Sequence, residues 1–179
     1  GLIIGRSDLT KSQYLYIDVF FRNTEEKGFN LLPVFTSQKP GHHGEQVIER
    51  FFICCDSLPR VSVLFNLGCW YNTRPEQERV VLEKLGVPVI NGIILSTNQK
   101  DWEKSLVGID IYNRSNLVAI PELAGYIEPS VAVVFDDFDH NSRIKNMIGY
   151  QMETLLGRIK NIHNLQTKPN REKKVALIY

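Results

Sequence analysis

The chain has 179 residues, of which 43% are hydrophobic and 23% are charged. This composition is typical of a folded domain and excludes an intrinsically disordered chain. The 21 basic and 20 acidic residues give a net charge of only +1, so the chain lacks the basic excess that nucleic-acid phosphates attract. No apolar run approaches the roughly 20 residues needed to cross a bilayer. We therefore expect no nucleic-acid partner and no membrane span.

The first half of the chain alternates short apolar runs with amphipathic segments. Gly28 and Gly86 follow two of these segments, as is typical of residues that end helices. Such alternation predicts right-handed βαβ crossovers and a parallel sheet covered by helices. We expect a flavodoxin-like or Rossmann-like α/β fold with strand order 2-1-3-4. The expected strands are 1–5, 30–35, 61–66 and 87–91, and the expected helices are about 12–28, 45–55 and 75–85.

The pattern changes after residue 91. A helix over 96–106 is followed by an irregular stretch over 110–139, and then by a long helix over about 142–164. This last segment has apolar residues at the three- and four-residue spacing of a helix that packs against protein. They are Ile144, Met147, Ile148, Met152, Leu155, Leu156, Ile159 and Ile162.

The sequence suggests three parts. Residues 1–95 are expected to form the parallel α/β domain, and 96–167 the irregular segment with the long helix. A polar linker and an apolar run, 168–179, are expected to lead into the first strand of a second α/β unit. Because both ends lie within apolar runs, we expect the sequence to be an internal piece of a longer protein.

Three cysteines, Cys54, Cys55 and Cys69, are an odd number that includes an adjacent pair. This arrangement does not suit a disulfide framework and indicates a reducing compartment, so we expect buried thiols and a cytoplasmic protein. The sequence contains neither G-x-x-x-x-G-K-[ST] nor a G-x-G-x-x-G after its first strand. We therefore expect neither ATP hydrolysis by a P-loop nor dinucleotide binding of the usual kind.

Two segments resemble one known family. Residues 119–129, Ala-Ile-Pro-Glu-Leu-Ala-Gly-Tyr-Ile-Glu-Pro, are similar to the A-[LI]-P-E-L-D-G-x-[IM]-E-P signature of the large subunits of CobN/magnesium-chelatase-type enzymes. Residues 168–176, Lys-Pro-Asn-Arg-Glu-Lys-Lys-Val-Ala, resemble the K-x-N-x-x-K-K-[VL]-A linker of the same family. One difference is Ala124, which stands where the family usually has Asp, and it suggests a divergent branch.

The resemblance implies a function for the longer protein. It would bind a tetrapyrrole, a corrin or a porphyrin, and insert or remove a divalent metal: cobalt, magnesium or haem iron. The metal would be a substrate, and ATP would be hydrolysed by separate AAA+ partner subunits. The isolated piece is expected to be inactive. Two other readings stay open: a non-catalytic flavodoxin-like module that binds a ligand, and a scaffold that docks subunits.

The resemblance also selects two carboxylates. Metal insertion removes two pyrrole protons, and carboxylates suit this transfer because burial tunes their pKa. Glu122 and Glu128 flank Gly125 and are expected to face one cleft as catalytic groups. The alternative for Glu122 is a turn acceptor, and for Glu128 a solvated charge or a partner of Arg143, since most glutamates are simply solvated.

Three further residues are candidate binding groups. Trp102 and Tyr126 offer flat faces to a macrocycle, because aromatic and apolar walls dominate such pockets. Packing in the core or at an interface is the alternative for both. His42, in a Gly-flanked loop after the second strand, is a candidate metal ligand. A solvated loop is the alternative, since no third ligand stands at a useful spacing.

Overall fold

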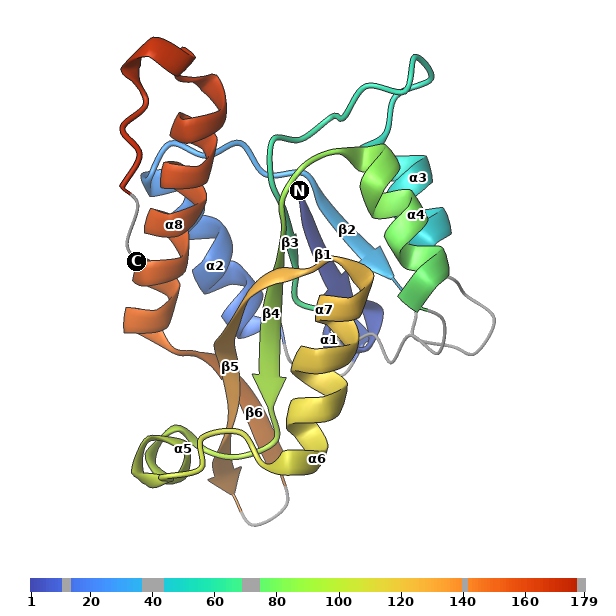
Figure 1. Cartoon of the computed structure of the whole chain (residues 1–179). Coiled ribbons are helices and arrows are strands. Elements are labelled where there is room, and N and C mark those ends of the chain that lie inside the picture. The colour runs from blue at the N-terminus through green and yellow to red at the C-terminus, as the bar shows by residue number, and fades with distance from the viewer. Residues whose placement is uncertain (11–13, 37–43, 69–74, 140–141, 177–179) are drawn as a thin grey trace.

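The computed structural model describes residues 1–10, 14–36, 44–68, 75–139 and 142–176. Its centre is a six-stranded sheet in the order β2-β1-β3-β4-β5-β6 (Figure 1). Strands β1 to β5 run parallel, and β6 is antiparallel to β5. The strands are β1 (Leu2–Gly5), β2 (Pro33–Thr36), β3 (Leu64–Asn66), β4 (Val89–Leu95), β5 (Ile127–Asp139) and β6 (Ser142–Met147).

Helices connect these strands in most of the crossovers. The α-helices are α1 (Arg6–Thr10), α2 (Leu15–Glu26), α3 (Gly44–Phe52), α4 (Pro75–Leu85), α5 (Gln99–Lys104), α6 (Ile111–Arg114), α7 (Ile120–Ala124) and α8 (Gly149–Thr167). A π-helical turn, η1 (Ser115–Ala119), joins α6 to α7, and a 3-10 turn, η2 (Asn170–Glu172), follows α8. No helix among the described residues is long and apolar enough to cross a membrane.

The parallel α/β fold and the strand order 2-1-3-4 are confirmed for the first four strands. The chain passes from β1 to β2 on one side and then returns to place β3 on the other side of β1. The switch point, where ligands usually bind in open α/β sheets, therefore lies at the carboxyl ends of β1 and β3. Residues beyond 95 also belong to this sheet, because β5 pairs with β4 over Ile90 to Leu95.

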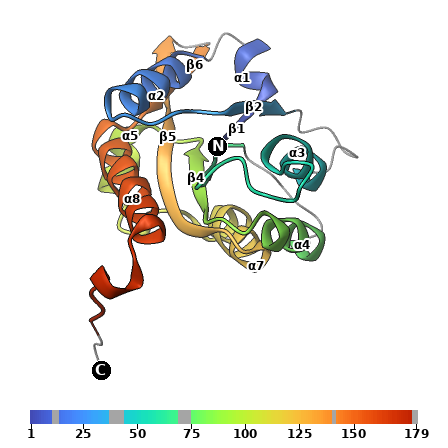
Figure 2. The same ribbon diagram turned by 90° about the horizontal axis from the view of Figure 1, so that it is seen from above.

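Two helical layers cover the sheet (Figure 2), and alternating side chains of the strands pack against them. In β1, Leu2 and Ile4 pack with residues of α2 and α8, whereas Ile3 packs with residues of α3, α4 and α7. On the first face the rings of Phe20 and Phe65 lie 5.4 Å apart between centroids. Each fully buried side chain of this size stabilises the fold by roughly 1.5–3 kcal/mol, so both layers are firmly attached.

The expectations for residues 110–164 were partly wrong. The stretch expected to be irregular contains α6, η1, α7 and the 13-residue strand β5. The expected helix over 142–164 is divided: 142–147 form β6, and α8 begins at Gly149. Ile144 and Met147 have the three-residue spacing of one helical face, whereas the same spacing places them on opposite faces of a strand. The long neighbouring strand β5 overrides the helical pattern, because it pairs with β6 from Val133↔Met147 to Asp139↔Ser142.

The apolar stripe of the long helix packs as expected. Met152, Leu155 and Leu156 are buried on α8, and Ile159 and Ile162 are partly buried against the same core. One other expectation was wrong. Cys54 and Cys55 are exposed rather than buried, and Cys69 lies outside the described residues. Residues 175–176 form no strand, and 177–179 lie outside the described part, so the strand expected to begin a second unit stays a prediction.

Candidate functional site

The signature segment folds as α7 followed by the first residues of β5. Gly125 ends the helix with φ of 102°, a left-handed conformation that glycine adopts without steric cost. Its amide donates to the Glu122 carbonyl at 3.0 Å, and the Tyr126 amide donates to the Pro121 carbonyl at 3.0 Å. These two bonds close the helix and turn the chain into β5.

A buried polar group fixes this turn to the rest of the fold. The Tyr126 hydroxyl donates to Oε1 of Glu78 on α4 at 2.5 Å and accepts from Nδ2 of Asn66 at 3.1 Å. The Asn66 Oδ1 in turn accepts from the Gly68 amide at 2.8 Å. Burial, followed by the charge of Glu78 and its hydrogen bond, holds the pKa of Tyr126 well above its usual value. The phenol therefore stays neutral and joins α7, α4 and the end of β3.

Beside this group lies a small cavity of about 20 Å³. Asn91 donates from Nδ2 to the Leu117 carbonyl at 2.6 Å and lines the cavity with Asn116 and Pro121. Such a volume has room for about one water molecule and not for a macrocycle. The described part of this site therefore contributes structure and polarity at the carboxyl end of β3, and a complete macrocycle pocket would need additional walls.

The two predicted carboxylates point to different parts of the molecule. Glu122 is exposed on α7. Glu128 is also exposed, has φ of 52°, and pairs through Oε2 with Nη1 of Arg158 on α8 at 2.6 Å. Because α7 and α8 cover opposite faces of the sheet, the two carboxylates do not share one cleft within the described residues, contrary to the sequence-based expectation.

The two predicted aromatic residues pack inside the protein. Tyr126 is 4% exposed and belongs to the core under α3, α4 and α7. Trp102, on α5, is half-buried and packs against a cluster that includes Leu95 and Ile148. His42 lies outside the described residues. Among the residues that are described, no group of three or more His, Cys, Asp and Glu side chains is placed to hold a metal ion.

A second buried polar cluster, which the sequence did not reveal, lies at the switch point. Asp8 of α1 accepts hydrogen bonds from the Tyr16 hydroxyl and from Nζ of Lys145, the latter at 2.5 Å. The Lys145 ammonium also lies 5.9 Å from the ring centroid of Tyr16 and 5.5 Å from that of Phe135. A cavity of about 190 Å³ opens beside Asp8 and Lys145. The sequence signal for this cluster was an acid in the short segment after the first strand, since Lys145 is 137 residues away.

Comparison with known proteins relates this architecture to one family. The sequence model of CobN/Magnesium Chelatase matches residues 1–179. Uncharacterized protein MJ0908 of Methanocaldococcus jannaschii is 25% identical over 200 residues, covering 100% of this chain and 16% of that protein. The catalytic subunit of cobaltochelatase from Mycobacterium tuberculosis has the same fold, with a TM-score of 0.75 and 14% identity over 96% of this chain and 15% of its own.

These coverages define the scale of the match. The chain spans only about a sixth of the length of either protein, so the likeness concerns one region of much longer polypeptides. The family match, however, leaves no part of the chain uncovered and includes the signature turn at Gly125. The chain therefore belongs to the CobN/magnesium chelatase family.

Proposed function

We propose that this chain is a region of a chelatase large subunit that binds a tetrapyrrole and inserts or removes a divalent metal. The observation that carries the proposal is the family match over residues 1–179, which includes the signature held by Tyr126 and Glu78. The structural likeness to a cobaltochelatase catalytic subunit supports the same fold. Cobalt and magnesium are the metals we propose as substrates, and separate AAA+ subunits are the proposed site of ATP hydrolysis.

The chemistry requires a group that accepts pyrrole protons as the metal enters. We propose Glu122 for this role, because it lies in the signature and its carboxylate is free of the ion pair that engages Glu128. The closed turn at Gly125 and the Tyr126–Glu78 bond fix the backbone that carries Glu122. Remaining walls of the parent protein would supply the exclusion of water that a general base needs. Trp102 and Tyr126 are proposed to support the site by packing.

The test is Glu122→Gln in the full-length protein with its partner subunits, followed by macrocycle absorbance during metal insertion or removal. Loss of a positioned general base lowers the rate by roughly 10²–10⁴-fold, with macrocycle binding unchanged. Glu76→Gln is the matched control, since Glu76 is an exposed acid in the first turn of α4. A Glu122→Gln protein that keeps more than about half the parental rate would exclude the catalytic role.

A different outcome would change the assignment. If Glu122→Gln weakens macrocycle binding while the rate at saturating macrocycle is unchanged, Glu122 is a wall of the pocket. If the unaltered protein binds no tetrapyrrole, the chelatase proposal fails as a whole. A protein that binds tetrapyrrole without metal-dependent turnover would instead be a ligand-binding module.

A further inference from the structure

A groove of about 500 Å³ lies between α2 and α8, at the edge of the sheet where β1, β2 and β3 begin. The two helices run beside each other in both views of the molecule (Figures 1 and 2). The volume is within the roughly 300–1,000 Å³ of small-molecule pockets. Its floor includes the apolar side chains of Phe20, Leu31, Val63, Phe65, Leu156 and Ile159, and the polar residues Thr24, Asn30, Ser62 and Asn164 also line it.

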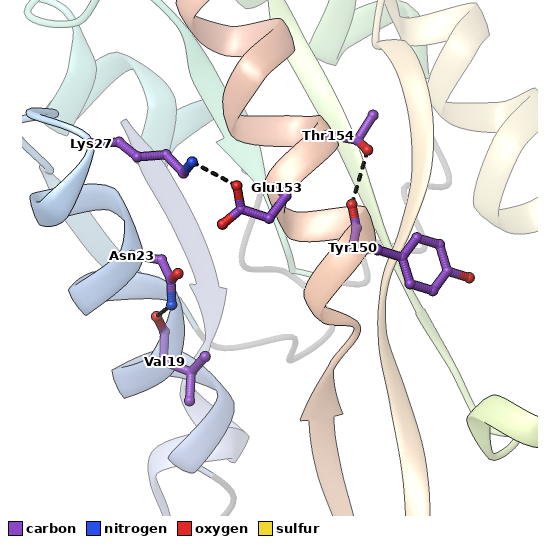
Figure 3. Close-up of polar contacts among 6 residues, drawn as sticks. All are labelled: Val19, Asn23, Lys27, Tyr150, Glu153 and Thr154. Atoms are coloured by element: carbon purple, nitrogen blue, oxygen red, sulfur yellow. Dashed lines mark hydrogen bonds and ion pairs between the residues drawn. The ribbon is translucent and has the colours of Figure 1, made fainter.

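The rim of this groove carries positive charge. Its lining includes Lys27, Arg60, Lys160 and His163, and no aspartate or glutamate. Lys27 bridges the two helices through its ion pair with Glu153 on α8, with 2.6 Å between Nζ and Oε2 (Figure 3). This pair fixes one side of the groove and neutralises Lys27.

The side chains of Arg60 and Lys160 are not neutralised in this way within the described residues. Within the described part of the chain, neither Arg60 nor Lys160 has a carboxylate within 4 Å. Among the described residues, the Arg60 guanidinium donates a single long hydrogen bond, 3.4 Å, to the Phe51 carbonyl, and its remaining N–H groups are available to a ligand. Two uncompensated positive charges therefore border an apolar floor.

This combination selects a class of ligand. A small inorganic anion gains little from an apolar floor and needs a dense set of donors. A neutral apolar ligand gains nothing from Arg60 and Lys160. An apolar body that carries carboxylates satisfies both parts, because its body covers the floor while its carboxylates meet the rim. A guanidinium suits this role especially, since its planar fork binds a carboxylate through two parallel hydrogen bonds.

We propose that this groove receives the carboxylate-bearing edge of the tetrapyrrole, with Arg60 and Lys160 pairing with its carboxylates. The inference rests on the proposed chelatase function and adds the residues that recognise the substrate's charge. It also locates that recognition at the amino edge of the sheet, on the face opposite to α7. Because Glu122 lies on the other face of the sheet, it would then act on a macrocycle delivered from the groove.

The experiment uses the full-length protein and an absorbance titration with uroporphyrin, a porphyrin whose every pyrrole bears carboxylate side chains. Arg60→Glu/Lys160→Glu should raise the Kd about tenfold or more, since two attractions are replaced by two repulsions. Lys100→Glu/Lys104→Glu is the matched control, with the same charge change on the exposed surface of α5, far from the groove (Figure 1). We expect the control to bind like the unaltered protein.

Three results would overturn the inference, and they are distinguishable. If the groove variant and the control bind equally well, the groove is not the site, whereas tetrapyrrole binding itself stands. If the unaltered protein binds no porphyrin, the inference and the proposed function fail together. A Lys160→Cys variant provides the third test, through maleimide labelling at residue 160 followed by peptide mass spectrometry. We expect labelling in the free protein and protection by uroporphyrin; no labelling in the free protein would mean that another segment fills the groove.

Discussion

The two edges of the sheet use polar side chains in opposite ways. At the carboxyl edge, Asp8 pairs with Lys145, and Glu78 pairs with Tyr126, and the four side chains are largely withdrawn from solvent. At the amino edge, Arg60 and Lys160 are exposed above an apolar groove. Among the described residues, no buried side-chain nitrogen or oxygen lacks a hydrogen-bond partner.

This difference separates groups that hold the fold from groups that are available to a ligand. A charge withdrawn from water requires its partner permanently, because losing the partner leaves an uncompensated buried charge. An exposed cation remains hydrated and costs little until a ligand arrives. Fold-level rules place ligands at the carboxyl edge of open α/β sheets. In the described part of this chain, Arg60 and Lys160 instead place two exposed cations at the amino edge.

The largest effect on stability is expected from Lys145→Met. The Lys145 side chain is 12% exposed and that of Asp8 is 3% exposed, so removing the ammonium leaves a buried carboxylate without its counter-charge. We expect the free energy of unfolding to fall by about 3–5 kcal/mol, measured by urea denaturation. Lys27→Met is the matched substitution at the amino edge. Its ion pair with Glu153 is 36% and 55% exposed, so we expect a loss of about 1 kcal/mol or less.

A second variant sharpens this contrast. Asp8→Asn/Lys145→Met removes both charges and should recover part of the loss, since no unpaired charge remains. Equal losses for Lys145→Met and Lys27→Met would contradict the distinction between the two edges.

A smaller effect is expected from Tyr126→Phe. The substitution removes the hydroxyl that donates to Glu78 and should lower the free energy of unfolding by about 1–3 kcal/mol near neutral pH. The folded-state pKa of Tyr126 is raised, so its contribution is fully present below the unfolded value of about 10 and is lost as pH rises through the folded value. The difference between the two proteins should therefore shrink above about pH 10. A difference that stays constant between about pH 8 and pH 11 would show that the phenol is not held neutral by burial.

The first half of the fold was predictable because the local sequence pattern of each helix and strand agrees with the contacts that the element makes in the folded sheet. The α4 helix begins at Pro75 and ends at Leu85, as expected from its flanking residues, and each strand is a short apolar run between turns. The second half was not predictable, because Ile144 and Met147 have the spacing of a helix although both lie in strand β6. Only the pairing with β5, a tertiary interaction, decides the outcome.

The candidate site was predictable only where a contiguous segment carries it. Residues 119–129 indicated the family, which the comparison confirmed. The partners of that segment come from far along the chain: Glu78 is 48 residues from Tyr126. Arg60 and Lys160 line the same groove because α8 packs on the sheet beside α2. No local sequence pattern predicts that these two residues lie near each other. The catalytic and binding roles of Glu122, Glu128, Trp102, Tyr126 and His42 stay predictions.

The groove at the amino edge is tested most directly by altering the protein charge and the ligand charge together. The measurement is the Kd of the full-length protein and of Arg60→Glu/Lys160→Glu for uroporphyrin and for a neutral amide derivative of the same ring. We predict that the substitutions weaken uroporphyrin binding about tenfold or more and change binding of the neutral derivative by less than about twofold. The two changes are not additive if the protein charges and the ligand carboxylates interact directly. Equal losses for the two ligands would contradict a charge contact between this groove and the carboxylates of the macrocycle.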